Sequence, residues 1–217
     1  MARIVMTDDG ICFDGRTLEQ RPLGGAETSF IEMANALARR GHDVMVCNKC
    51  ATGVVHRGVT WRPIDQGVPE EADLYIPNRG DRLLKLCRRA RNVIFWIHNP
   101  AVYLLKWRYQ WKLAWRRPVI VFSGVSHAGT YPGWAMAGGR EIVPYGLTDI
   151  FCHATERDQP PPPRAVFTSN PMRSLDWLLD LWEGRIRPAV PAAELHVFAG
   201  IATYGAAGAA KAGRMGP

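Results

Sequence analysis

Short apolar runs flank a helical pattern at the start of the chain. Residues 3–7 and 43–47 are apolar, β-branched runs that end at polar residues, which is typical of strands. Between them, apolar side chains recur at helical spacing from Phe30 to Ala38 and form one continuous stripe. Two arginines and a glycine close this helix, because cations suit the negative end of the helix dipole. A strand, a helix and a strand in this order predict the crossover unit of a parallel sheet.

Further apolar runs predict that the sheet continues along the chain. The predicted strands are residues 58–64, 72–77, 92–100, 119–123 and 141–146. The run at 92–100 is almost continuously apolar, as expected for a strand that is covered on both faces. Residues 82–91 predict a basic helix with an apolar inner face, and helices are expected between the later strands. The predicted inner face consists of Leu83, Leu86 and Cys87. The sequence therefore predicts an α/β fold with a Rossmann-like parallel sheet.

Four consecutive prolines at 160–163 interrupt this alternation. Such a run cannot join a helix or a central strand, and it forms a stiff extended spacer. We therefore predict a linker at 158–163 between an N-terminal domain, residues 1–157, and a second domain, residues 164–217. The second domain opens with a strand, a helix and a strand, predicted at 164–168, 175–187 and 194–199.

Composition and charge narrow the class of protein. The chain has 217 residues and 47% hydrophobic residues, which suffice for a sizeable core, and no apolar run is long enough to predict a membrane span. Five scattered cysteines and the lack of a signal-peptide pattern favour a reducing cytoplasm over a disulfide-stabilised secreted fold. Cys47 and Cys50 have the spacing of a zinc or redox pair, but no second pair completes a site, so no metal is expected. The net charge of +7 favours anionic partners.

Three positions are candidates for chemistry on local grounds. Gly24 and Gly25 stand before the first helix, where free N–H groups attract an anion, although such a pair is also common in plain turns. His98 ends a predicted strand, at the rim where parallel sheets bind ligands, or it is a hydrogen-bonded structural group. Arg173 precedes a predicted helix, where a cation and free N–H groups together suit a diphosphate, or it is simply an exposed side chain.

Three segments in order resemble one family of enzymes. They are Leu23-Gly24-Gly25-Ala26-Glu27, the stretch 142–151, and the stretch 167–179 with its following strand at 193–200. Together they resemble the group 1 (family four) glycosyltransferases of the GT-B fold, and the likeness spans residues 3 to about 205. The resemblance implies a complete N-terminal Rossmann-like domain and the first β-α-β of a second, nucleotide-sugar-binding Rossmann-like domain.

The resemblance also implies a reaction and a set of site residues. Such enzymes move a sugar from a nucleotide-sugar donor to an acceptor with retention of configuration. The acceptor is a glycan, a lipid or a small molecule, and neither a cofactor nor a metal is expected. The implied catalytic residue is His98, the implied substrate-binding residues are Gly24, Gly25, Glu27, Asn99, Tyr145 and Gly146, and the implied diphosphate-binding residues are Arg173 and Ser174.

The chain also departs from the family pattern. The family places an Arg and a Lys on the donor diphosphate, whereas here Ser169 stands near the Arg position and Arg173 near the Lys position. The family's Glu-x(7)-Glu is absent, because no Asp or Glu follows Gly200. The resemblance therefore predicts a truncated enzyme with weak or no activity alone. A sugar-nucleotide epimerase of the same fold is an alternative, but it needs an acidic pair near the cleft, and the sequence offers no candidate.

Residues 103–117 predict a basic, aromatic helix. Tyr103, Trp107, Trp111 and Trp115 recur every four residues, and Arg108, Lys112 and Arg116 follow the same period. Either the tryptophans pack on the core, or the helix lies in a membrane interface. The second reading predicts one helix over 101–115 with an exposed basic face. The alternative function is then a non-catalytic module on an anionic membrane surface, in a cytoplasmic protein peripheral to the inner face of the membrane. No nucleic-acid-binding pattern is present, so no nucleic-acid partner is expected.

Overall fold

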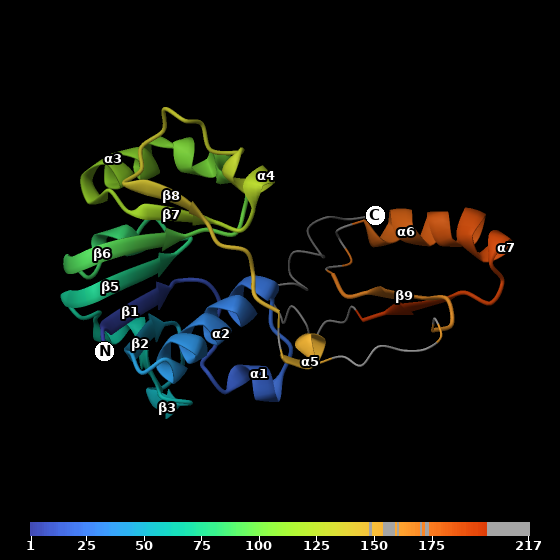
Figure 1. Ribbon diagram of the computed structural model, residues 1–217, viewed down its shortest axis with the longest axis horizontal. Helices are drawn as coiled ribbons and strands as arrows, with labels where there is room; N and C mark the ends of the chain where they lie inside the picture. Colours follow the sequence, from blue (N-terminus) through green and yellow to red (C-terminus); the bar gives the residue numbers. More distant parts are fainter. Residues whose placement is uncertain (148, 154–158, 160, 170, 172–173, 199–217) are drawn as a thin grey trace. The chain divides into compact units, whose positions relative to one another are not determined.

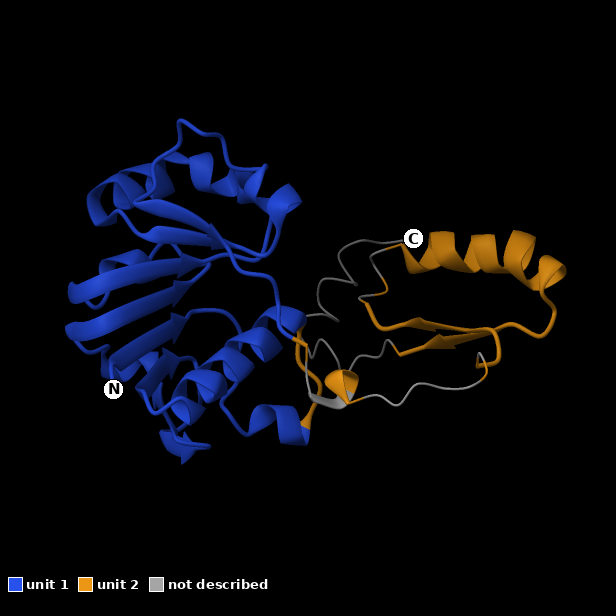
Figure 2. Ribbon diagram, viewed as in Figure 1, with its two compact units in different colours: residues 1–20, 25–146 blue, residues 21–24, 147–217 orange. Residues whose placement is uncertain are grey.

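The computed structural model describes residues 1–147, 149–153, 159, 161–169, 171 and 174–198 (Figure 1). The chain divides into two compact units (Figure 2). Unit 1 comprises residues 1–20 and 25–146, and unit 2 comprises residues 21–24 and 147–217. The predicted proline linker stays a prediction, because residues 158 and 160 lie outside the described part of the chain.

Unit 1 is built on one eight-stranded sheet in the order β3-β4-β2-β1-β5-β6-β7-β8. Every neighbouring pair is parallel except β3 and β4. The strands are β1 Arg3–Asp8, β2 Asp43–Asn48, β3 Val54–His56, β4 Val59–Pro63, β5 Glu71–Asn78, β6 Arg89–Trp96, β7 Val119–Phe122 and β8 Gly139–Ile142. The prediction of a Rossmann-like α/β fold is therefore confirmed for unit 1.

The helices of unit 1 connect these strands. The α-helices are α1 Thr17–Gln20, α2 Gly25–Arg39, α3 Trp107–Arg116 and α4 Val125–Ala128, and the 3-10 turns are η1 Ile64–Gln66, η2 Leu83–Lys85 and η3 Ala101–Leu105. Figure 1 shows α2 lying along the sheet beside β1 and β2, and α2 also contacts β4. No helix in the described part of the chain is both long and apolar enough to cross a membrane.

The core of unit 1 follows from the apolar runs. After Arg3, every residue of β1 is buried, as expected for a central strand of a parallel sheet. The apolar stripe of α2, including Phe30, Ile31 and Ala34, is buried as well. A separate cluster of buried residues surrounds β6, β7 and α3, and it includes Phe95, Ile97, Leu104, Leu113, Ile120 and Phe122.

Strand order reverses next to β1. The chain proceeds from β1 to β2 and β4 on one side, and then returns to pair β5 with the other side of β1 before continuing to β6, β7 and β8. The carboxyl ends of β1 and β5 therefore flank a topological switch point. In open parallel sheets, ligands bind at such points.

The predicted helix over 82–91 is wrong. Only η2 is helical there, Cys87 adopts a left-handed φ of 45°, and β6 begins at Arg89. The N–H of Arg89 donates to the carbonyl of Glu70, and β6 then pairs with β5 over most of its length. Pairing within the sheet therefore overrides the local helical pattern.

The predicted single helix over 101–115 is also wrong. Lys106 has an extended backbone (φ −61°, ψ 137°), so the 3-10 turn η3 ends before it and α3 begins after it. The predicted strand at 141–146 lies earlier, as β8, because Pro144 has no N–H to continue the ladder. The antiparallel strand β3 was not predicted, and it turns into β4 through Arg57 and Gly58, both with positive φ.

Unit 2 contains a small parallel pair of strands, β9 Arg164–Phe167 and β10 Glu194–Val197. Its helices are α5 Asp149–Cys152, α6 Leu175–Leu181, the π-helical segment η4 Trp182–Ile186, and α7 Arg187–Ala189. The predicted strand, helix and strand are therefore present, although Ala199 of the predicted last strand lies outside the described residues. None of the described residues of unit 2 is buried.

Candidate functional site

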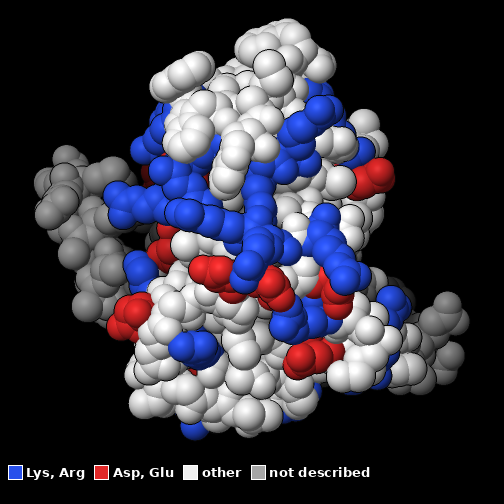
Figure 3. Space-filling model, turned by 90° about the vertical axis from the view of Figure 1, so that its left-hand side faces the viewer, with Lys and Arg blue, Asp and Glu red and all other residues white. Residues whose placement is uncertain are grey.

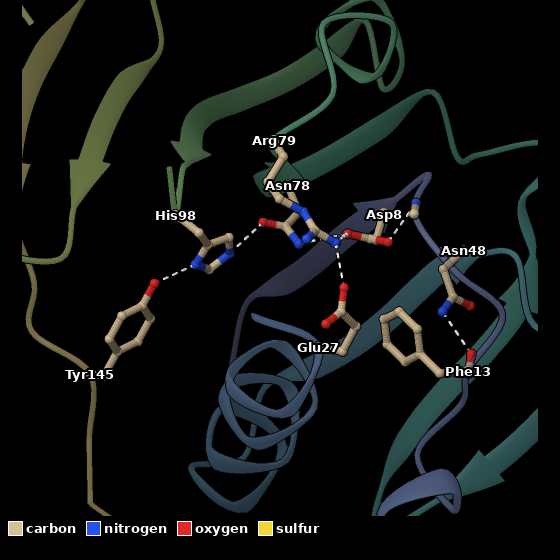
Figure 4. Close-up of polar contacts among 9 residues, drawn as sticks. Asp8, Phe13, Glu27, Asn48, Asn78, Arg79, His98 and Tyr145 are labelled. Carbon is tan, nitrogen blue, oxygen red and sulfur yellow. Dashed lines mark hydrogen bonds and ion pairs between the residues drawn. The ribbon is translucent and has the colours of Figure 1, made fainter. Parts of the chain in front are cut away.

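Polar side chains collect at the carboxyl edge of the sheet in unit 1 (Figure 4). Asp8 ends β1, Asn78 ends β5 and Arg79 follows it, and His98 comes two residues after β6. Tyr145 follows β8 three residues beyond its last residue. Since carboxyl ends of parallel strands share one edge, these side chains meet there, at the switch point between β1 and β5.

Asp8 is the buried anion of this site. One carboxylate oxygen, Oδ1, accepts a hydrogen bond from the N–H of Gly10 at 2.8 Å. The other, Oδ2, accepts from Asn78 Nδ2 at 2.6 Å and from Arg79 Nη2 at 2.9 Å. Three donors, one of them a cation, replace the water that the buried carboxylate has lost.

Arg79 joins Asp8 to the first turn of α2. Its Nη2 atom lies 2.9 Å from Asp8 Oδ2 and 2.9 Å from Glu27 Oε1. Burial of the guanidinium opposes its charge, but the two carboxylates outweigh that effect and raise the pKa of Arg79 above its ordinary value. Arg79 also has a left-handed φ of 62°, and its N–H donates to the carbonyl of Trp96 at 3.0 Å. Two carboxylates and one guanidinium leave this cluster with a net charge of −1.

Asn78 fixes the tautomer of His98. Because its Nδ2 donates to the Asp8 carboxylate, its Oδ1 is the atom that faces His98 Nε2, at 2.8 Å. An amide oxygen only accepts, so His98 Nε2 carries the proton. In the neutral ring, Nδ1 is then an acceptor, and it lies 2.6 Å from the hydroxyl of Tyr145. The Tyr145 O–H therefore donates to His98.

His98 is held as a neutral imidazole. Burial, followed by the nearby charge of Arg79, lowers the pKa of His98 to about 4, so the ring is uncharged at neutral pH. The rings of His98 and Tyr145 are stacked, with centroids 5.9 Å apart and planes 9° from parallel. Burial also raises the pKa of Tyr145, which keeps its phenol protonated as a donor. The result is a hydrogen-bonded chain from Glu27 through Arg79, Asp8, Asn78 and His98 to Tyr145, which we call the edge network (Figure 4).

A second histidine lies on the next loops of the sheet. His127 Nδ1 accepts from the N–H of Ser123 at 3.1 Å and lies 3.0 Å from the Ser123 hydroxyl. Its Nε2 donates to the carbonyl of Asn99 at 2.7 Å. Asn99 thus contributes its backbone rather than its side chain to this contact, and His127 ties the loop after β6 to the start of α4.

The structure brings some of the predicted site residues together and leaves others apart. Glu27, His98 and Tyr145 belong to the edge network. Gly25 is the first residue of α2, and Gly146 has open space where a Cβ would stand. Gly24 belongs to unit 2, as does Ser174, which precedes α6 with a φ of 67° and makes no side-chain capping bond. Arg173 lies outside the described residues.

Sequence reasoning did not single out Asp8, Asn78 and Arg79, nor the pair Ser123 and His127. A signal for the first two was present, since Asp8 follows the predicted strand 3–7 and Asn78 follows the predicted strand 72–77. The rule that selected His98, a polar residue at the carboxyl end of a parallel strand, applies equally to both.

No group of three or more His, Cys, Asp or Glu side chains within the described ranges is placed to hold a metal ion. Cys47 and Cys50 are buried free thiols. Burial raises the pKa of Cys47 to about 11, so the thiolate that would bind zinc or react is disfavoured.

The sheet and its edge define unit 1 as a Rossmann-like α/β fold with a polar network at the switch point. A comparison of the chain with protein-family models and with curated proteins finds no match.

Proposed function

We propose that this chain is of the glycosyltransferase type and moves a sugar from a nucleotide-sugar donor to an acceptor with retention of configuration. The edge network carries the proposal, because it joins two of the three segments in which the sequence resembles the family. Glu27 comes from the Gly-Gly-x-Glu segment, Tyr145 comes from the 142–151 segment, and His98 occupies the position of the family's histidine.

The chemistry of the edge network suits a ligand rich in hydroxyl groups. Neutral His98 offers the Nδ1 lone pair to a hydroxyl, and in the described structure the phenol of Tyr145 occupies it. Asn78 and Asp8 hold the ring and its proton in place without taking part in that contact. A sugar or acceptor hydroxyl would accordingly bind at Nδ1 in place of Tyr145, with no change in the protonation of the ring.

The charge of the edge network separates this role from phosphate binding. Arg79 is already bound to two carboxylates, and the cluster has a net charge of −1, which disfavours a diphosphate. The resemblance instead assigns the donor diphosphate to Arg173 and Ser174 in the second domain, where a cation stands near a helix start.

The epimerase alternative receives a candidate acidic pair from the structure, since Asp8 and Glu27 both lie at the edge of the sheet. Arg79 Nη2 lies 2.9 Å from an oxygen of each carboxylate, so both already have a partner within the edge network. His98 Nδ1, which accepts a hydrogen bond from a hydroxyl, has no charged partner and is bonded to Tyr145. This geometry therefore supports transfer of a sugar to a hydroxyl better than epimerisation.

Equilibrium dialysis of residues 1–217 against a panel of radiolabelled nucleotide sugars tests the proposal. We expect one donor to be retained and to be displaced by its own nucleoside diphosphate. The His98→Gln variant should retain it about fivefold less, because a buried hydrogen bond to a neutral ligand contributes about 1 kcal/mol. His153→Gln, a change at an exposed histidine, is the matched control.

Release of nucleoside diphosphate is then measured with glycan, lipid and phenolic acceptors, and the configuration of any product is read by NMR. We expect slow release, because the sequence offers one cation near the diphosphate and no Glu-x(7)-Glu. If the parent chain retains no member of the panel, or if His98→Gln retains the donor as well as the parent does, the proposal is wrong.

A further inference from the structure

Helix α3 presents a different face to solvent from the one that the sequence predicted. Lys112 is buried and forms an ion pair with Asp81. Arg116 turns its guanidinium toward the backbone carbonyls of Cys87 and Arg88, the latter at 2.6 Å. Of the three predicted surface cations only Arg108 is exposed, so the prediction of a basic face made by all three is wrong.

The tryptophans of α3 are the side chains that face solvent. Trp107 is 79% exposed, Trp111 38% and Trp115 55%. They lie at steps of four residues and opposite the buried Tyr109 and Leu113, because Trp111 is two positions, or about 200° of helical rotation, from each of those residues. The three indoles form a continuous line along one helix, which we call the Trp ridge. A monomeric protein rarely leaves such a line of large aromatic side chains in water without a binding role.

Cations surround the Trp ridge and acids are absent from its part of the sequence. Residues 82–140 contain 11 Lys and Arg and no Asp or Glu. Four of these cations form ion pairs with acids that lie just before this range in the sequence: Arg89 with Glu70 and Glu71, Arg91 with Asp73, and Arg108 and Lys112 with Asp81. Lys85 Nζ lies 4.8 Å from the centre of the Trp111 ring, and the Arg116 guanidinium lies 5.8 Å from that of Trp115. Lys106 and Arg117 bound α3 at its two ends, and both are exposed. Figure 3 shows Lys and Arg side chains gathered in a band across one face of the molecule, with Asp and Glu side chains along one edge of the band.

We propose that the Trp ridge docks on an anionic bilayer surface, with α3 lying in the plane of the interface. Indole rings settle at the level of lipid head groups, where an apolar ring and a polar N–H both find suitable surroundings. Lys85 and the cations at the ends of α3, Lys106 and Arg117, then face anionic head groups, and each contributes to binding near the surface. The inference rests on α3 and its neighbours and does not depend on the proposed transfer reaction.

Two other occupants fit the observations less well. Self-association through the ridge would bring two cationic surfaces together, which like-charge repulsion opposes. Single-stranded nucleic acid stacks its bases on aromatic side chains within a basic groove. The Trp ridge, by contrast, lies on the solvent face of a single helix, and the cations of Lys85 and Arg116 lie over the rings of Trp111 and Trp115.

Vesicle flotation of residues 1–217 tests the proposal. Vesicles of phosphatidylcholine alone are compared with vesicles of phosphatidylcholine mixed with phosphatidylglycerol, at low and high salt. We expect binding to the anionic vesicles only, with loss at high salt. Replacing Trp107, Trp111 and Trp115 together by Gln should weaken binding about tenfold or more, since the apolar anchors are removed while the net charge is kept.

Trp177→Gln is the matched control, because Trp177 is 62% exposed but lies on α6 of unit 2. It should bind like the parent. Brominated lipids should quench tryptophan emission in the parent and not in the triple variant, because the quenched indoles are those of the Trp ridge. Far-UV spectra of all variants check that the fold is retained.

Three results would overturn the proposal. Anionic vesicles could bind parent and triple variant equally. A short single-stranded RNA could bind the parent and not the variant, which would assign the ridge to nucleic acid. Sedimentation could show a parent dimer that the triple substitution dissociates, which would assign it to a second copy of the chain.

Discussion

The proton on His98 is placed by a carboxylate that the histidine does not touch. Asp8 orients the amide of Asn78, and the amide oxygen then requires a proton on His98 Nε2. The opposite nitrogen becomes the acceptor that faces Tyr145. Two residues on two different strands, Asp8 and Asn78, thus set the position of a proton on His98, and none of the three is near another in sequence. Such an arrangement is visible only once the strand order is known.

The first prediction concerns the pH dependence of stability at His98. The pKa falls from 6.5 in the unfolded chain to about 4 in the folded one. As pH drops below 6.5 the unfolded state takes up the proton first, so the stabilisation is complete above pH 6.5 and is lost toward pH 4. Between pH 7 and pH 5 the parent should lose about 2 kcal/mol of unfolding free energy through this group.

Urea unfolding at pH 7 and pH 5 measures this effect. His98→Gln removes the titrating group, so its unfolding free energy should fall by about 2 kcal/mol less than that of the parent over the same interval. The exposed His153→Gln variant should follow the parent. A parent and a His98→Gln variant with the same pH dependence would show that His98 titrates normally in the folded state.

At the scale of single elements, strands that are buried on both faces could be predicted from their apolar sequence. Strands that depend on pairing with a neighbour could not. The runs that became β1, β2, β5 and β7 are apolar enough to identify in isolation. The first half of β6 carries Arg89, Arg91 and Asn92, all exposed, and only its pairing with β5 makes it a strand. Likewise, the position of Lys112 depends on Asp81, a partner 31 residues away that no local pattern reveals.

The second prediction concerns the loop that leads into β8. Gly138 donates its N–H to the carbonyl of Pro118 at 2.8 Å, and a Cβ added to it would overlap the carbonyl oxygen of Arg117. Gly138→Ala should therefore lower the unfolding free energy by about 1–3 kcal/mol, because rigid backbone rather than a mobile side chain must move. Gly133→Ala in the same loop meets no atom within 4 Å and should change stability by less than about 0.5 kcal/mol. Equal stability of the two variants, measured by thermal unfolding, would show that this packing is looser than described.

At the scale of the whole molecule, the α/β class follows from the order of apolar runs, whereas the site depends on topology. The sequence identifies His98 by its place at a strand end, and Glu27 and Tyr145 through a family resemblance. It does not show that they share one network with Asp8, Asn78 and Arg79. In the sheet, β2 pairs with one side of β1 and β5 with the other, and the second pairing brings Asn78 beside Asp8. Strand order of this kind is set by long-range packing. The same limit applies to α3, because its sequence pattern left open whether the tryptophans pack on the core, and the buried residues are Tyr109, Lys112 and Leu113.

The last prediction concerns unequal stability of the two units. Unit 1 buries both faces of its central strands, whereas no described residue of unit 2 is buried, and β9 and β10 form a sheet of only two strands. A two-stranded sheet with a few short helices removes too little apolar surface from water to balance the entropy of ordering its chain. Amide hydrogen exchange followed by mass spectrometry should therefore show β9 and β10 exchanging long before β1, β2 and β5. Leu195, paired with Ala165, and Val5, paired with Tyr75, are matched reporters, because each lies in a parallel strand pair. Protection at Leu195 equal to that at Val5 would show that unit 2 is stabilised by contacts beyond its described residues, and the inequality predicted here would be wrong.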